Sequence, residues 1–190
     1  SGQTVKIFDS ATPPEQVQRM FAKFRDVHTN VAGGKARPSA SFDAMLRMIG
    51  EGKGELFVNI FNEMVISYLY CGHSGGIASG WMQVNIPDNP VGAPRHLLEW
   101  EAILHYRHQG LILYDVGVRF LKSQFGYVVD DKLESIGFYK ERLGGVLAPE
   151  IHYTKYLDRS LMEAEWEIKM QYGINAHLAK ASSNANSANM

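Results

Sequence analysis

The chain has 190 residues, of which 45% are apolar and 21% charged, and its formal net charge is -1. A chain of this length can bury a full hydrophobic core, so it needs no disulfide or metal to fold. The near-zero charge argues against a dedicated nucleic-acid binder, which carries a basic surface excess. The single cysteine, Cys71, cannot form an internal disulfide and suits a reducing compartment, so we expect a cytoplasmic protein. No apolar run approaches the roughly 20 residues that span a bilayer, and we expect no signal peptide at the start.

The first half of the chain predicts two helices and then three strands. Thr12–Glu15 has the residues of a capping box, with Thr12 as the N-cap, and the helix that it begins is expected to end near His28. A second helix is expected from Ser39 or Ser41 to Gly50. Three segments rich in β-branched and aromatic residues follow and predict an antiparallel meander: 55–61, 64–71 and 77–84.

The second half predicts one crossover between parallel strands. Residues 96–109 form a mostly apolar helix, and 111–116 is an almost wholly apolar strand, as expected when both faces are covered. Strand, helix and strand make a βαβ unit. The helix residues expected to face inward are Leu97, Trp100, Ile103 and Leu104. Further elements are expected at 131–143 (helix), around 150–157 (strand or hairpin) and at 160–180 (helix).

The expected fold class is therefore mixed α/β, with an antiparallel meander, one parallel βαβ crossover and flanking helices. It lacks the regular alternation of a Rossmann sheet. We expect a single domain over residues 1–180 and a flexible tail over 181–190. This layout is similar to that of GNAT acyltransferases.

Three segments sharpen this resemblance and together span roughly residues 25–150. Val27–Asp43 resembles the "H…AG…RP…(W/F)D" entry of FemAB-like N-acyltransferases. His96–Ile103, with Gly110 and Tyr114–Gly117 after it, resembles the family's helix-and-strand signature. Ile136–Gly145 resembles its "I..FK..FGG" ending, with a tyrosine where the first phenylalanine is usual. The chain departs from ordinary GNAT enzymes because Asn85–His96 lacks their Arg/Gln-x-x-Gly-x-Gly/Ala phosphate loop.

The resemblance implies an enzyme that transfers an acyl group from an activated donor to an amine by direct attack. Acyl-CoA is the favoured co-substrate, with no tightly bound cofactor. An amino sugar or nucleotide-linked sugar is the implied acceptor, which points to cell-envelope polysaccharide. An aminoacyl-tRNA donor is the alternative, and it is the one nucleic-acid partner expected. The missing phosphate loop supports a further alternative, a catalytically silent GNAT-like binding subunit.

The donor-binding candidates lie on the third meander strand and at the start of the crossover helix. In GNAT folds the parallel strands splay and leave backbone N–H groups for the donor, which points to Gly80, Trp81 and Met82 beside Ser79. Gly80 permits close backbone approach, or marks only a bulge. A helix N-terminus favours phosphate, and Arg95 and His96 stand there. Lys140 is added by resemblance as a donor contact.

The catalytic and acceptor-binding candidates come from other segments. His28 has an ordinary pKa suited to a base at neutral pH and sits beside a glycine-containing loop. In that loop Lys35 and Arg37 are the acceptor-binding candidates, since a guanidinium can clamp phosphate or carboxylate. Asp115 ends a strand expected to be buried and could orient or deprotonate the amine. Tyr139 is the candidate general acid, or a core residue.

Two other sites and one interface are weaker hypotheses. Gly72–Gly76 fits the Gly-x-Ser-x-Gly nucleophile elbow, with Asp115 and His152 in hydrolase order, but no helix follows it. His105 and His108 have a metal-compatible spacing, but no nearby ligands complete a site, and we expect no metal. The final helix could serve a subunit interface in a homo-oligomer.

Overall fold

The computed structural model describes residues 2–32, 37–92, 94–119, 129–148, 155 and 157–187. The chain divides into two compact units, Ser1–Gly117 and Val118–Met190, which are treated separately below. A single domain over 1–180 therefore stays a prediction.

In the first unit, five strands form one mixed sheet in the order β1-β2-β3-β4-β5. The strands are β1 (Gln3–Phe8), β2 (Gly54–Phe61), β3 (Met64–Ser74), β4 (Ile77–Asn85) and β5 (Leu113–Asp115). Neighbours from β1 to β4 are antiparallel, whereas β5 runs parallel to β4. Helix α3 (Pro94–His108) connects the two parallel strands. The mixed α/β class, the meander and the βαβ crossover are thus confirmed.

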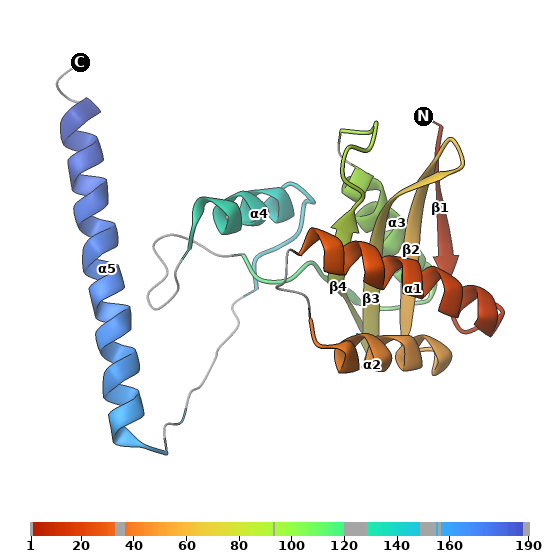
Figure 1. Ribbon diagram of the computed structural model, residues 1–190, viewed down its shortest axis with the longest axis horizontal. Coiled ribbons are helices and arrows are strands. Elements are labelled where there is room, and N and C mark those ends of the chain that lie inside the picture. The colour runs from red at the N-terminus through yellow and green to blue at the C-terminus, as the bar shows by residue number, and fades with distance from the viewer. Residues whose placement is uncertain are drawn as a thin grey trace. The chain divides into compact units, whose positions relative to one another are not determined.

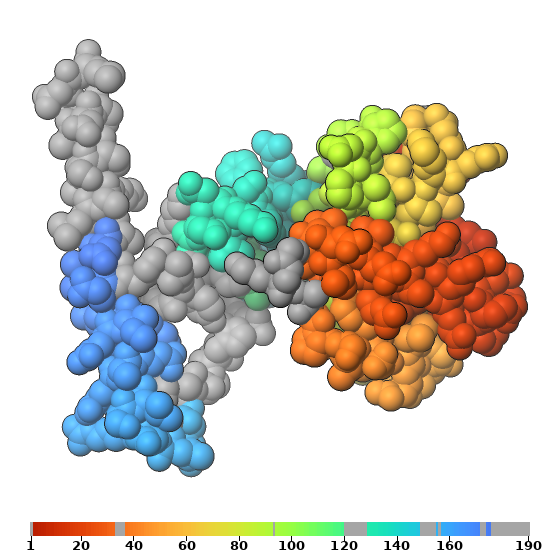
Figure 2. Space-filling view, in the orientation of Figure 1, coloured from red at the N-terminus to blue at the C-terminus, as the bar shows by residue number. Residues whose placement is uncertain are grey.

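Helices α1 (Pro14–Val31) and α2 (Ser39–Gly50) cover one face of the sheet (Figure 1). Their inward residues follow the helical period and pack with alternate residues of the strands. The resulting core is largely aromatic: its buried members include Phe21, Phe24, Phe42, Leu56, Tyr68 and Tyr70. The Tyr70 hydroxyl donates to the Met45 carbonyl at 3.1 Å, which joins α2 to β3. In Figure 2 the viewed side of this unit is formed largely by atoms of α1 and α2, coloured red to orange.

Helix α3 packs against the opposite face (Figure 1). Its buried residues Leu98, Ala102 and Tyr106 are spaced by four and meet Phe57 and Leu69 of the sheet. The sequence placed Trp100 inward, and that prediction was wrong, since its side chain is 54% exposed. The helix is turned so that Glu99 is buried instead, a charged residue that hydrophobic periodicity alone assigns to the surface.

Two features at the start of the chain were not predicted correctly. Strand β1 was missed, although Val5 and Ile7 alternate with polar residues, and it pairs in unbroken register with β2. Thr12 is not the helix cap: Pro13 is the N-cap residue of α1, and the Thr12 hydroxyl donates to the Asp9 carboxylate at 3.0 Å. Asp9 thus organises the turn between strand and helix.

The second unit contains two described helices, α4 (Asp131–Glu141) and α5 (Arg159–Ser187). The Asp130 side chain accepts from Leu133 N at 2.7 Å and caps α4. Both helices were predicted, but α5 extends to Ser187, past Ala181, where a flexible tail was expected. The strand or hairpin expected around 150–157 lies almost entirely outside the described residues.

The orientation of α3 can be tested by stability. Leu98→Ala removes a side chain that is 0% exposed and should lower the free energy of unfolding by about 2–5 kcal/mol. Trp100→Ala, although a larger truncation, should change it by no more than about 0.5 kcal/mol. Urea denaturation followed by circular dichroism measures both. A larger loss for Trp100→Ala would contradict this packing.

Candidate functional site

The candidate site lies where β4 parts from β5. The parallel pairing covers only Ile77–Ser79 of β4. From Gly80 to Asn85 the strand pairs with β3 alone, among the residues that the structure describes. Within the described residues, one edge of β4 from Gly80 onward is therefore left without a strand partner. Gly80, Trp81 and Met82 lie on this edge, whereas Ser79 is still paired with Asp115.

A β-bulge marks the point of separation. Tyr70 pairs with Met82 and Cys71 with Gly80, so Trp81 is the extra residue on β4. A bulge re-aims the side chain that it carries. The Trp81 ring lies near the Tyr70 ring, with centroids 5.9 Å apart, yet remains 44% exposed. A Cβ on Gly72 would stand 2.7 Å from the indole, so this position must be glycine for Trp81 to lie against β3.

Arg37, from the segment before α2, reaches the bulge. Its Nη2 donates to the Trp81 carbonyl at 3.4 Å, a long contact that leaves most of the exposed guanidinium available. No carboxylate in the described segments forms an ion pair with Arg37. The structure therefore places this predicted acceptor-binding residue beside the predicted donor strand.

His28, near the end of α1, is the third group at this end of the sheet. Its ring packs edge-on against Phe42, with centroids 5.7 Å apart. Its Nδ1 is buried and meets no hydrogen-bond partner within the part of the chain that the structure describes. A buried polar atom of this kind requires a water or a ligand to satisfy it. Burial lowers the pKa of His28, and the nearby Arg37 cation lowers it further, so the imidazole is neutral at neutral pH.

The start of α3 is anchored to the sheet on its other face. The buried Asn59 side chain donates to the Pro94 carbonyl at 2.9 Å and to Gln3 Oε1 at 3.0 Å. Arg95 and His96 follow at the first turn, half-buried and exposed respectively. The Ser67 hydroxyl of β3 also donates to the Pro94 carbonyl, at 3.5 Å, and Ser67 is the pairing partner of Asn85. The first turn of α3 therefore lies near the end of β4, and a helix N-terminus favours phosphate.

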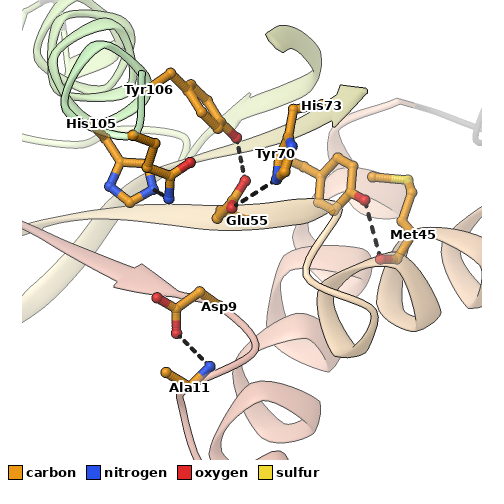
Figure 3. Close-up of polar contacts among 9 residues, drawn as sticks. Asp9, Ala11, Met45, Glu55, Tyr70, His73, His105 and Tyr106 are labelled. Carbon is orange, nitrogen blue, oxygen red and sulfur yellow. Dashed lines mark hydrogen bonds and ion pairs between the residues drawn. The ribbon is translucent and has the colours of Figure 1, made fainter. Parts of the chain in front are cut away.

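Two buried carboxylates lie between α3 and the sheet, and the sequence analysis assigned neither. Glu55 accepts a hydrogen bond from the Tyr106 hydroxyl, and His73 Nε2 lies 3.3 Å from its other oxygen (Figure 3). Glu55 is only 4% exposed. A buried carboxylate is tolerated only when it is hydrogen-bonded or paired, and these two partners meet that requirement.

The second carboxylate, Glu99 of α3, lies under the bulge. It accepts from the Tyr114 hydroxyl of β5 at 2.6 Å, and the same hydroxyl is 3.5 Å from Cys71 Sγ. Burial, together with the nearby cysteine and carboxylate, raises the pKa of Tyr114, which keeps its proton. Burial also raises the pKa of the Cys71 thiol, which excludes a reactive thiolate there.

Asp115 stands at the end of β5, in register with Ser79. The sequence analysis expected a buried strand here, and that was wrong: Asp115 is exposed, as are Ile112 and Leu113. Asp115 Oδ1 accepts from Gly117 N at 2.7 Å, so its carboxylate caps the loop that follows β5. Its position at the mouth of the β4–β5 separation still allows a role toward an amine, which stays a prediction.

Three further predicted site residues lie outside the described residues or in the second unit. Lys35 lies outside the described residues. Tyr139 and Lys140 belong to α4 of the second unit, where Lys140 Nζ donates to the Val118 carbonyl at 3.0 Å. Their proposed roles stay predictions.

The alternative sites gain no support. Ser74 ends β3, and the next two glycines form the turn of a β-hairpin into β4, so the strand–turn–helix of a nucleophile elbow is not formed. No group of three or more potential metal-binding His, Cys, Asp or Glu residues occurs in the described segments. Nor is any described helix long and apolar enough to cross a membrane.

The family described as "Acetyltransferase (GNAT) domain" matches residues 2–127. The chain belongs to this family. Among curated proteins, none matches its sequence. The family description names the GNAT domain and no subtype, so the FemAB-like subtype stays a resemblance of sequence segments.

Solved structures similar to this GNAT-family chain show the same fold at very low sequence identity. The aminoglycoside acetyltransferase meta-AAC0020 from an uncultured soil metagenomic sample, in complex with sisomicin, has a TM-score of 0.58 and 8% identity, covering 83% of this chain and 97% of its own. The aminoglycoside N-acetyltransferase AAC(6')-Iy in complex with CoA has a TM-score of 0.56 and 8% identity, covering 82% and 95%. The aminoglycoside acetyltransferase HMB0005, also from an uncultured soil metagenomic sample, has a TM-score of 0.51 and 10% identity, covering 83% and 100%.

The environment of His28 can be tested by NMR titration of its imidazole. We expect a pKa below the ordinary 6.5. Arg37→Gln should raise this pKa, because the cation that disfavours the imidazolium is removed, but it should stay below 6.5 because burial is the larger cause. A pKa at or above 6.5 in the wild-type chain, or no response to Arg37→Gln, would contradict the arrangement.

Proposed function

We propose that this chain is an N-acyltransferase that moves an acyl group from acyl-CoA to a primary amine. The observation that carries the proposal is the edge of β4 that no described strand pairs with, which runs from Gly80 at the bulge to Asn85, near the N-terminus of α3. The family match supports acyl transfer as the reaction, because the family is an acetyltransferase domain.

The donor would lie along this edge. Backbone groups of β4 from Gly80 onward would hydrogen-bond the extended thiol arm, as one more strand would do, and the bulge would hold the thioester carbonyl. The phosphates would meet the first turn of α3, where Arg95 and His96 stand. The segment Asn85–His96 lacks the usual glycine-rich phosphate loop, so the helix terminus and these side chains carry more of that contact.

The acceptor amine would approach from the side of α1 and α2, where His28 and Arg37 lie. The neutral imidazole of His28 takes the proton of the amine, and the amine nitrogen attacks the thioester carbonyl carbon. A new C–N bond forms, the C–S bond breaks, and the CoA thiolate leaves and is protonated. Arg37 also favours an uncharged amine, because a nearby cation lowers the pKa of an ammonium group as it lowers that of His28.

An amino sugar, free or nucleotide-linked, is the acceptor class that we propose. The exposed Trp81 indole offers a flat apolar surface for a sugar ring, and Arg37 can bind a phosphate bidentately. Aminoglycosides, the substrates named for several similar structures, are themselves amino-substituted sugars. Asp115 would orient the amine from the β5 side.

Donor binding is measured first, by thermal shift and isothermal titration with acetyl-CoA, longer acyl-CoAs and free CoA. A ligand present at about 100 times its dissociation constant stabilises the folded state by roughly 2.7 kcal/mol. We expect acyl-CoA to raise the melting temperature. No shift with any of these ligands would contradict the CoA donor and turn attention to an aminoacyl-tRNA donor or to a silent binding module.

The role of His28 is tested by transfer rate. With an amine acceptor found by screening, His28→Asn should lower kcat by about 100-fold or more, because the general base is lost. His108→Asn, at an exposed histidine in the last turn of α3, is the matched control and should leave the rate unchanged. Equal rates for wild type and His28→Asn would remove His28 from the mechanism.

A further inference from the structure

Tyr114 connects β5 to the rest of the first unit from beneath the candidate donor site. Its ring stacks on Tyr106 of α3, with centroids 6.0 Å apart. Its hydroxyl donates to Glu99 at 2.6 Å. The same oxygen would stand 3.1 Å from a Cβ built on Gly80, the residue directly before the bulge. Through this one side chain, β5 contacts α3 at Tyr106 and Glu99 and contacts β4 at Gly80.

Little else in the described residues of the first unit holds β5. Its ladder with β4 is three residues long, and two bonds at its start run from Ile112 N and Leu113 N to the Gly76 carbonyl, at 2.9 Å and 3.4 Å. The neighbouring side chains face solvent, since Ile112 is 87% and Leu113 53% exposed. The contacts of Tyr114 are thus the main side-chain attachment of β5 in this unit.

We propose that Tyr114 and Glu99 are positioning residues that set the opening between β4 and β5 and thereby the affinity for the acyl donor. The Glu99–Tyr114 bond holds β5 against α3, so that β5 cannot drift toward or away from the free edge of β4. A Cβ on Gly80 would stand 3.1 Å from the Tyr114 hydroxyl, so a side chain at this position would press on the Glu99–Tyr114 bond. This proposal rests on the proposed function, since it assumes that the donor binds along that edge.

The first test separates donor from acceptor kinetics. Tyr114→Phe keeps the ring and removes the hydrogen bond to a carboxylate, and it should raise KM for acyl-CoA roughly threefold or more, with KM for the amine unchanged. Glu99→Gln retains an acceptor oxygen and should stay close to wild type. The matched control is Tyr106→Phe, which removes the equivalent bond to Glu55 on the side away from β5. It should lower stability similarly but leave KM for acyl-CoA unchanged.

The second test uses the close approach at Gly80. Gly80→Ala places a methyl group against the Tyr114 hydroxyl and should weaken donor binding. Adding Tyr114→Phe relieves that clash, so the double variant should bind acyl-CoA better than Gly80→Ala alone. If Gly80 is needed instead because the donor approaches its backbone directly, adding Tyr114→Phe will not restore acyl-CoA binding to Gly80→Ala.

The outcomes distinguish this inference from the function on which it depends. If wild-type protein binds no acyl-CoA, the proposed function has failed. If wild type binds and Tyr114→Phe, folded by circular dichroism, binds equally well, the positioning role is refuted and the proposed function stands. Equal effects of Tyr114→Phe and Tyr106→Phe on donor KM would likewise overturn it, because they would reflect general loosening of the core.

Discussion

The architecture of the candidate site depends on one constraint, the short ladder between β4 and β5. An inner strand of a sheet normally pairs along both edges, and a backbone N–H or C=O group that is buried without a partner is costly. Here the pairing stops after Ser79, and the bulge at Trp81 follows within two residues. The unused backbone groups therefore form a row that an extended ligand can satisfy. The site is a consequence of how the sheet ends, since a longer ladder would close it.

The two faces of the sheet differ in how they support this edge of β4. The face under α1 and α2 is an aromatic core that supports His28, Arg37 and the Trp81 ring. The face under α3 carries two buried carboxylates, each held by a tyrosine hydroxyl. Apolar side chains of similar volume would cost less free energy to bury there. Directional hydrogen bonds, however, fix the spacing of strand and helix.

Local patterns were enough to predict the helices, the meander and the crossover, because amphipathic periodicity and turn residues act over a few positions. They also drew attention to His28 and Arg37, whose roles in a site stay predictions. The face of α3 was predicted wrongly because Trp100 is the largest apolar residue of the helix, while the buried Glu99 is stabilised by Tyr114, fifteen residues away. No local pattern contains such a partner. A charged residue inside an otherwise apolar helix was the available signal.

Strand β1 was missed for a different reason. Its alternation of Val5 and Ile7 is visible in the sequence, but the strand is short and lies at the start of the chain, where no turn signal precedes it. Its partner β2 lies some fifty residues later. The bulge at Trp81 was likewise beyond sequence reasoning, since Gly80 could signal either a bulge or a donor contact, and the register of β3 against β4 decides the matter.

The most direct test of the account is an amide chemical-shift map of the first unit with and without acetyl-CoA. Saturating ligand should perturb the backbone amides from Gly80 to Asn85 and at the first turn of α3, while β1 and β2 stay unchanged. Chemical-shift changes confined to another surface, with none along the β4 edge, would show that the donor does not bind where β4 separates from β5.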